Sequence, residues 1–325
     1  MRLLKLVPDD TNIGFLKWRN IAMAISFMTI AASFALVAIK GLNYGVDFAG
    51  GQMIQATFTQ DQEAPVAELR EEIQGIGIDG ASIQRFGEPN QVSVRLREIE
   101  AEGGDVEVAQ STAERVTEMM EENFPGVRID SVDSVSGKVS DELYSAGAWA
   151  LGLAMLAISI YIWIRFEWQF GVAALFALFH DVALTFGFFA LTQLEFNLNI
   201  VAAILTIIGY SLNDTIVVFD RIRENLRKYR KMEIIALLDL SVNETLARTV
   251  MTSLTMLVAL VVLLFVGPEV IFGFTAAMTL GIFVGTYSSV YMAAPILIWL
   301  KVGPDTFVPD DARGPKAEHK EGYTR

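Results

Sequence analysis

The sequence predicts an α-helical membrane protein with six transmembrane helices and a small α+β domain outside the membrane, between the first two helices. The first observation is composition: 53% of the 325 residues are apolar and only 19% are charged, whereas soluble domains carry about 25% charged residues. The second is a set of six apolar stretches, each near the roughly 20 residues that a helix needs to cross a bilayer. The third is one long polar insertion, residues 41–142.

The composition also argues against several classes of protein. The chain has no cysteine, which excludes disulfides and thiolate metal sites, and its having only two histidines argues against a His-rich metal site. A net charge of −13 argues against nucleic-acid binding, which needs a basic surface. The sequence shows no Walker loop, dinucleotide motif or catalytic triad. We therefore expect no cofactor and no enzymatic activity.

The six apolar stretches define the expected spans. They cover residues 21–39, 143–164, 168–194, 196–219, 249–266 and 270–300. The first is longer than the roughly 7–15 residues of a signal-peptide core, so we expect a retained anchor. In the last stretch Pro295 predicts a kink or break.

Lysines and arginines predict the orientation. With both termini in the cytoplasm, 17 of the 25 basic residues lie on that side, as the positive-inside rule requires. The chain then divides into a cytoplasmic N-terminus, a first helix, a periplasmic domain, five further helices with a basic cytoplasmic connector, and a cytoplasmic tail. The corresponding residues are 1–20, 21–40, 41–142, 143–300 (connector 220–248) and 301–325.

The inserted domain carries the acidity of the whole chain, with 21 acidic and 7 basic residues. A solvated acidic face and a site for a basic partner both fit this charge. Its apolar pattern predicts the order βαββαβ, which is the ferredoxin-like pattern. The expected strands and helices are 52–58, 66–74, 81–86, 91–96, 106–124 and 127–135.

Two features lie between the fourth and fifth spans. Residues 221–231 are strongly basic, which fits the ordinary positive-inside signal as well as a site for anionic lipid or a cytoplasmic partner. Residues 241–244, Ser-Val-Asn-Glu, fit a capping box that would start the helix leading into the fifth span.

A stripe of small residues runs along the last span at a spacing of four. Such stripes let helix backbones approach closely in lipid, so we expect this face to pack against another helix, in particular one of a partner subunit. The stripe consists of Gly273, Ala277, Gly281, Gly285 and Ser289.

Ionisable residues inside the spans are the strongest candidates for function. A charge at the bilayer centre costs about 2.5–3.5 kcal/mol, so it should have a partner or a task. Asp214 lies in a polar cluster with Ser211 and Asn213. Arg248 begins the fifth span at a similar depth, and we expect an Asp–Arg pair, although snorkelling of Arg248 to the headgroups is an alternative.

A second candidate is the pair His180–Asp181 near the middle of the third span. Burial there would favour a neutral carboxyl, as a proton carrier requires. A satisfied polar contact between helices explains the pair equally well.

Four motifs lie in or beside the spans. Gly45-Val-Asp47-Phe-Ala-Gly50-Gly51 follows the first span, and Ile208–Asn225 belongs to the fourth. His180-Asp-Val and Leu246-Ala-Arg-Thr belong to the third and fifth. These motifs resemble those of the SecD/SecF family, the accessory subunits of the bacterial Sec translocon, and Ile208–Asn225 resembles the SecF signature. The fourth-span motif is highly specific for SecF.

The resemblance implies half of an RND-type unit in the bacterial inner membrane. It implies a SecD-like partner, the small protein YajC, and the SecY channel with SecA as neighbours. The complex would use the proton-motive force to promote late export of preproteins, with Asp214, Arg248 and, more weakly, Asp181 on the proton path. Two other functions stay open, half of a proton-coupled small-molecule exporter and a passive scaffold of the translocon.

Overall fold

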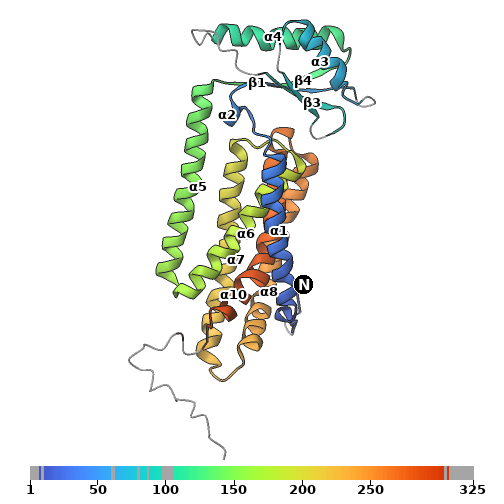
Figure 1. Ribbon diagram of the computed structural model, residues 1–325. Helices are drawn as coiled ribbons and strands as arrows, with labels where there is room; N and C mark the ends of the chain where they lie inside the picture. Colours follow the sequence, from blue (N-terminus) through green and yellow to red (C-terminus); the bar gives the residue numbers. More distant parts are fainter. Residues whose placement is uncertain are drawn as a thin grey trace, which may run out of the picture.

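Six long helices and a small α+β domain make up the chain in this computed structural model (Figure 1). The structure describes residues 7–8, 11–59, 63–78, 81–85, 88–96, 106–303 and 306. Most of the expected cytoplasmic tail therefore lies outside the described residues. The α+β domain sits at one end of the helices, joined to them through α1 and α5.

The helices agree with the expected spans in number and order, and most are longer than expected. A 3₁₀ turn, Phe15–Trp18, leads into α1, and a second, Glu269–Ile271, precedes α9. The sixth helix has three parts, α9, a π-helical turn and α10. The bounds are α1 Arg19–Lys40, α5 Gly137–Arg165, α6 Trp168–Thr192, α7 Leu198–Lys228, α8 Ile234–Val266, α9 Phe272–Ser288, the π turn Ser289–Ala293 and α10 Ala294–Trp299.

The π-helical turn explains how the last span accommodates Pro295. Proline has no N–H, and its ring clashes with the carbonyl four residues earlier, which here belongs to Tyr291 in the π turn. The helix widens just before Pro295 instead of ending there. Such π turns are frequent at functional sites.

The connector differs from expectation. Helix α8 begins at Ile234, so the expected capping box at 241–244 is wrong. Ser241 lies inside the helix, where its Oγ donates to the Leu237 carbonyl (2.8 Å) and accepts from Asn225 Nδ2 of α7 (3.0 Å). The sequence pattern of a cap thus lies inside a helix, and its serine bonds to a neighbouring helix instead of capping a helix start.

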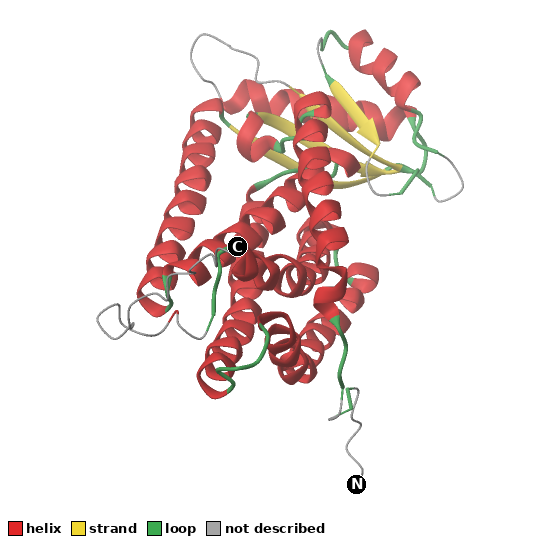
Figure 2. Cartoon of the chain, turned by 60° about the horizontal axis from the view of Figure 1, so that its bottom comes forward, coloured by secondary structure: helices red, strands yellow, loops and turns green. Residues whose placement is uncertain are grey.

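The extramembrane domain has the element order expected from the sequence, with strands β1 (Gly51–Thr57), β2 (Ser82–Arg85), β3 (Gln91–Leu96) and β4 (Arg128–Val135). Helix α3 (Val66–Gly75) follows β1, and α4 (Val106–Asn123) follows β3. The sheet is antiparallel in the order β2-β3-β1-β4. Both helices cover the face away from the transmembrane helices (Figures 1 and 2).

Strand alternation gives this sheet two different faces. Ile54 and Val94 are cross-strand partners and are fully buried in the core beneath the helices, with Leu69 of α3 and Met120 of α4. Gln55, one residue along β1, points to the opposite face. That face is turned toward the transmembrane helices (Figure 1).

Among the long helices, α6, α7 and α9 form the buried centre. Their core includes Phe170, Phe189 and Phe219, which are almost fully buried. Helices α5 and α8 expose most of their apolar side chains, and α5 stands apart from the others along much of its length (Figure 1). An exposed apolar surface of this size is expected for helices that face lipid.

The small-residue stripe of α9 packs inside the chain, against α7. A side chain at Gly281 would collide with Ile207, and one at Gly285 would come within 3.0 Å of Ser211 Cβ. At Gly273 the nearest atom is Ile200 Cδ1, at 3.3 Å. The expectation that a partner subunit covers this stripe is therefore wrong, because α7 already occupies it.

Candidate functional site

Asp214 lies on the buried face of α7 with only 8% of its surface exposed. Thr249 of α8 donates a hydrogen bond from Oγ1 to Asp214 Oδ1 at 2.6 Å. Ser289 of the π turn lies nearby, but Oδ2 is buried and accepts no well-formed hydrogen bond from the described residues. Asp214 is thus a buried carboxyl with one oxygen held by Thr249 and the other without a well-formed hydrogen bond from the described residues.

Arg248 is placed differently from expectation. Its side chain is on the exposed side of α8, and it acts on Asp214 through its charge, while Thr249 makes the direct contact. Successive helical residues are turned by about 100°, so Thr249 and Arg248 cannot both point at α7. The expected Asp–Arg pair is therefore electrostatic, with a threonine in the position of direct partner.

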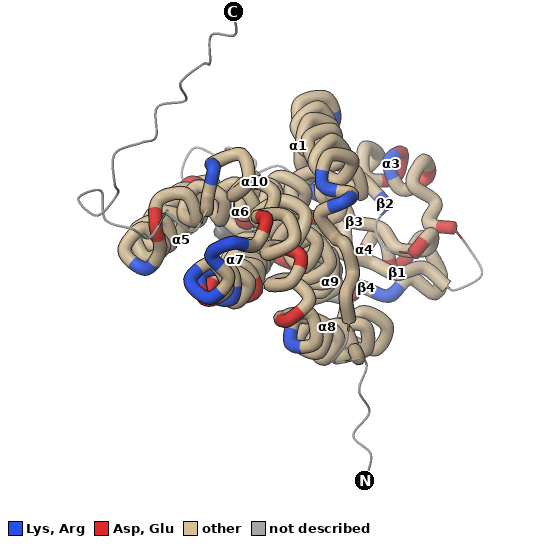
Figure 3. Tube along the Cα trace, turned by 90° about the horizontal axis from the view of Figure 1, so that it is seen from below, with Lys and Arg blue, Asp and Glu red and all other residues tan. Residues whose placement is uncertain are grey.

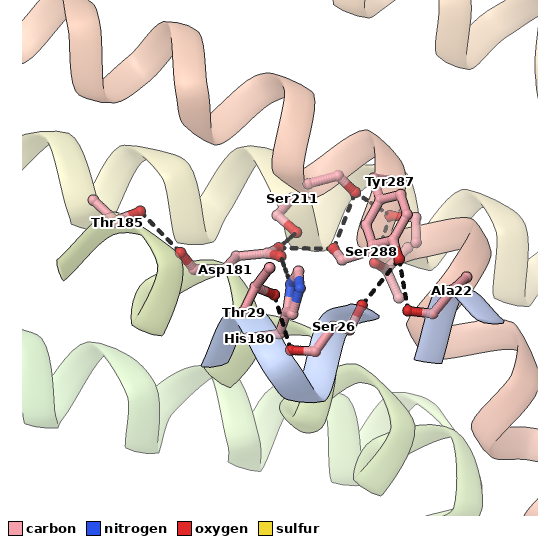
Figure 4. A network of polar contacts seen from close by, with 12 residues as sticks. Ala22, Ser26, Thr29, His180, Asp181, Thr185, Ser211, Tyr287 and Ser288 are labelled. Atoms are coloured by element: carbon pink, nitrogen blue, oxygen red, sulfur yellow. Dashed lines mark hydrogen bonds and ion pairs between the residues drawn. The ribbon is translucent and has the colours of Figure 1, made fainter. Parts of the chain in front are cut away.

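Asp181 is the centre of a second polar cluster, which joins three helices (Figure 4). His180 Nδ1 lies 2.9 Å from Oδ1, in position to donate a proton to it. Oδ2 accepts from Ser211 Oγ of α7 at 2.5 Å and from Ser288 Oγ of α9 at 2.8 Å. His180 and Asp181 are each 1% exposed. Both oxygens of this buried carboxyl therefore find their hydrogen-bond partners inside the bundle.

The π turn connects the two clusters. Ser288 bonds to Asp181, while the next residue, Ser289, bonds to Thr215 of α7 (2.9 Å), beside Asp214. In a regular helix two successive residues diverge by about 100°, and the widened turn lets both reach buried partners. The hydroxyls can donate or accept, so this chain of groups can adjust when a carboxyl gains or loses a proton.

Asn213 does not belong to either cluster. The sequence placed it beside Asp214, but its side chain lies on the exposed face of α7. Ala202, Thr206 and Gly209 are exposed along the same face, and a side chain at Gly209 would meet no atom within 4 Å. A polar residue on the outer face of a transmembrane helix favours contact with another helix over contact with lipid.

The glycine motif after α1 lies at the junction of the two parts of the molecule. Gly50 and Gly51 have φ angles of +66° and +96°, which glycine adopts readily. Asp47 Oδ2 accepts from the backbone N–H of Leu198, the first residue of α7 (2.8 Å). A side chain at Gly45 would collide with the carboxylate of Glu195.

The sequence reasoning missed the part that several residues play in these sites, although Thr249 belongs to a quoted motif and Ser289 to the small-residue stripe. Thr249, Ser288 and Ser289 are hydroxyl residues in apolar helices, and their spacing alone does not say whether they bond within their own helix or across it. Glu195 carried a usable signal, because it is an isolated acidic residue in the short turn between two spans. Within the described residues, no group of three or more histidine, aspartate or glutamate side chains could hold a metal ion.

These features define a class of protein: a multi-pass membrane protein with a small extramembrane domain and buried carboxyl groups between its helices. The model of the family "Protein export membrane protein SecD/SecF, C-terminal" matches residues 115–303, and that of the "SecD/SecF GG Motif" matches residues 35–62. The chain belongs to this SecD/SecF family, and its role is that of an accessory subunit of the Sec translocase.

Full-length relatives agree. The protein translocase subunit SecF of Cereibacter sphaeroides is 42% identical over 322 residues, which are 98% of this chain and 96% of the relative. SecF of Rickettsia felis is 40% identical over 295 residues, with 90% and 94% covered. These proteins are named as translocase subunits, a transport role.

Solved structures of SecDF show the same fold. The translocon-associated membrane protein SecDF of Thermus thermophilus matches with a TM-score of 0.80 and 34% identity. SecDF in a super-membrane-facing form matches with a TM-score of 0.64 and 33% identity. The two matches cover 90% and 93% of this chain but only 39% and 40% of the SecDF chains. This chain thus spans about two-fifths of SecDF.

Proposed function

We propose that this chain couples the proton-motive force to late steps of preprotein export, and that Asp214 carries the proton. The observation that carries the proposal is a buried carboxyl whose Oδ1 is held by Thr249 and whose Oδ2 accepts no well-formed hydrogen bond from the described residues. A neutral carboxyl needs little solvation, and an ionised one needs the nearby charge of Arg248. The site can therefore accommodate both protonation states.

The energy available is sufficient for such a role. One charge that crosses 100 mV releases about 2.3 kcal/mol, and each 1.4 kcal/mol changes an equilibrium about tenfold. Transfer of one proton through Asp214 would therefore change the population ratio of two arrangements of helices α7 and α8 by more than tenfold. Asp181 is a second candidate on this path, linked to Asp214 through Ser288 and Ser289.

The proposed location is the bacterial inner membrane, with the α+β domain in the periplasm and both termini in the cytoplasm. Figure 3, which views the molecule from the end opposite the domain, shows lysines and arginines gathered at the end of α7 and the start of α1. Those at α7 include Arg221, Arg223, Arg227 and Lys228. The positive-inside rule assigns this end to the cytoplasm.

The proposed partner is a SecD-like subunit. The exposed face of α7 with Asn213, Thr206 and Gly209 is small and partly polar, as helix interfaces in membranes are. YajC, SecY with SecA, and the preprotein would be the further neighbours of such a complex. The name SecDF of the matching structures supports a joined SecD and SecF unit.

The decisive experiment replaces Asp214 by asparagine in vesicles that contain the assembled translocon. Asp214→Asn preserves the size and the acceptor for Thr249 but cannot take up a proton, so we expect assembly to be unchanged and stimulation by the proton gradient to be lost. Asp214→Glu should keep part of the stimulation. Thr255→Val on α8 is the control, since Thr255 bonds only to backbone carbonyls of its own helix in the described hydrogen bonds. Full stimulation in a well-assembled Asp214→Asn complex would leave a passive scaffold as the better description.

A further inference from the structure

The loop between α6 and α7 is held against the segment that joins α1 to the extramembrane domain. The N–H of Phe196 donates to the Asn43 carbonyl (2.7 Å), and the Phe196 carbonyl accepts from the N–H of Gly45 (3.0 Å). Asp47 accepts from the N–H of Leu198, where the start of α7 leaves amides unpaired. These contacts between residues 41–47 and 193–198 are called the clamp below.

Glu195 extends the clamp to the sheet. Gln55 of β1 donates from Nε2 to Glu195 Oε2 (3.3 Å). Arg95 of β3 acts on the carboxylate through its charge and donates from Nη2 to Asn43 Oδ1 (3.0 Å). Gly45 leaves the room that the Glu195 carboxylate fills. One side chain thus contacts both the linker and the sheet face turned toward the transmembrane helices.

A cavity beside this side chain gives it a route to water. Its volume is about 450 Å³, and it lies between the sheet and the ends of the transmembrane helices. Polar groups from the sheet line one side and apolar groups from α7 to α9 the other, among them Gln55, Gln91, Glu195, Asn197, Ile200 and Phe272. A carboxyl at the wall of such a cavity can exchange protons with solvent.

We propose that Glu195 is a positioning residue that couples the extramembrane domain to the transmembrane helices: the clamp closes when its carboxylate takes up a proton and loosens when it releases one. The proposal deepens the proposed function, because it adds a proton-dependent contact between the helices and the domain they would move. It concerns a carboxyl outside the transmembrane helices and needs no proton transfer through Asp214.

The direction follows from the surroundings of Glu195. Burial raises the pKa of its carboxyl from 4.5 to about 7. The charge of Arg95 and a hydrogen bond with Asn197 oppose the rise, while the negative charges of Asp47 and Asp133 add to it. In an open clamp the carboxyl would return to its ordinary pKa of 4.5. The closed state therefore binds the proton more tightly, and this stabilisation of the clamp is lost as the pH rises from about 4.5 to about 7.

Hydrogen–deuterium exchange of the full chain in lipid nanodiscs tests this proposal. The amides of Gly45, Phe196 and Leu198 are bonded across the clamp, so their exchange reports its opening. Each rate is divided by that of Glu195→Gln at the same pH, which cancels the intrinsic pH dependence of exchange. Because glutamine stays neutral, we expect a ratio of about 10 at pH 5.5 that rises about 30-fold, to about 300, at pH 8.5.

Glu88→Gln is the matched control, because Glu88 lines the same cavity. That variant should behave as the wild type does at every pH. In the wild type alone, protection of the clamp amides should fall about 30-fold relative to Ile54 and Val94 of the sheet over the same range. This second measurement holds even if Glu195→Gln folds poorly.

A ratio that stays flat would overturn the proposal. A ratio below one at pH 8.5 would also overturn it, because the ionised carboxylate would then close the clamp through Arg95. The measurement uses equal pH on both sides and no translocation. Its failure is therefore distinguishable from a failure of the proton pathway at Asp214.

Discussion

At the scale of single residues, the two buried carboxyls of the bundle differ in how completely they are satisfied. Asp181 has three side-chain partners, His180, Ser211 and Ser288. Among the described residues Asp214 has one well-formed bond, from Thr249, and its Oδ2 accepts none, although Ser289 lies nearby. A carboxyl that must change its protonation state does so more easily with few hydrogen-bond donors around it, because fewer hydrogen bonds must then be broken or replaced. This difference favours Asp214 as the group that exchanges a proton and Asp181 as its support.

Thr249 provides the test of this view. Thr249→Val keeps the shape but removes the donor to Asp214 Oδ1, so the ionised carboxylate loses about 1.5–3 kcal/mol of stabilisation. We expect stimulation of export by the proton gradient to fall at least tenfold while assembly persists. Thr249→Ser retains the hydroxyl and should keep most of the stimulation. Thr252→Val is a control on the same helix, since Thr252 bonds only to backbone carbonyls of its own helix in the described hydrogen bonds. Equal stimulation in Thr249→Val and wild type would contradict the role of this bond.

The sequence predicted the important residue types better than their contacts. Asp214 and Asp181 were identifiable because an ionisable group in an apolar helix is costly. The contact between Asp214 and Thr249 was not, because it depends on the rotation of α8, which hydropathy does not determine. Asn213 shows the same limit, since neighbours in sequence point to different faces of a helix.

At the scale of elements, α7 and α9 are the pair on which the site depends. Their close approach brings Ser211 and Ser288 together around Asp181, and it requires glycine at Gly281 and Gly285. The stripe was visible in the sequence, but its partner helix was not. A stripe of small residues indicates that another helix packs closely against it, but it does not indicate which helix that is.

Gly281→Ala tests this packing. The added methyl would collide with the side chain of Ile207, and such overpacking costs about 1–3 kcal/mol. We expect a lower midpoint of unfolding for the purified chain in detergent titrated with sodium dodecyl sulfate. Gly152→Ala on α5, where nothing lies within 4 Å, should leave the midpoint equal or raised. If Gly281→Ala kept its stability but lost its association with a SecD-like subunit, the stripe would belong to a subunit interface and not to the contact with α7.

The helices and strands themselves were largely predictable, because period and length report them directly. The predicted strand 91–96 matches β3, and the predicted helix 66–74 matches α3 to one residue. The ends of α7 and α8 were not predictable from hydropathy. Both helices extend beyond the apolar stretch as polar helices, held together by Asn225, whose side chain donates to Ser241 and to Glu244 Oε2 (2.7 Å).

At the scale of the whole molecule, the two parts differ in the surface that they present. The transmembrane helices expose large apolar side chains such as Trp149, Trp163 and Phe265. The 102 residues of the insertion instead carry a net charge of −14, which keeps the domain away from anionic headgroups. The sequence alone indicated this division. The clamp was not predictable, because it joins residues about 150 positions apart in the chain.

The last prediction concerns orientation, which determines on which side the domain and its clamp act. The chain has no cysteine, so single cysteines can be introduced without background. Glu71 lies on an exposed position of α3, and Tyr229 follows α7 at the opposite end of the molecule. With the basic end of α7 in the cytoplasm, Glu71→Cys should react with an impermeant thiol reagent in intact spheroplasts, because the outer membrane no longer protects it. Tyr229→Cys should react only after the inner membrane is opened. Reaction of both positions with the opened cells shows that each thiol is accessible. Labelling of position 229 from outside would place the basic connector in the periplasm and would overturn the proposed orientation.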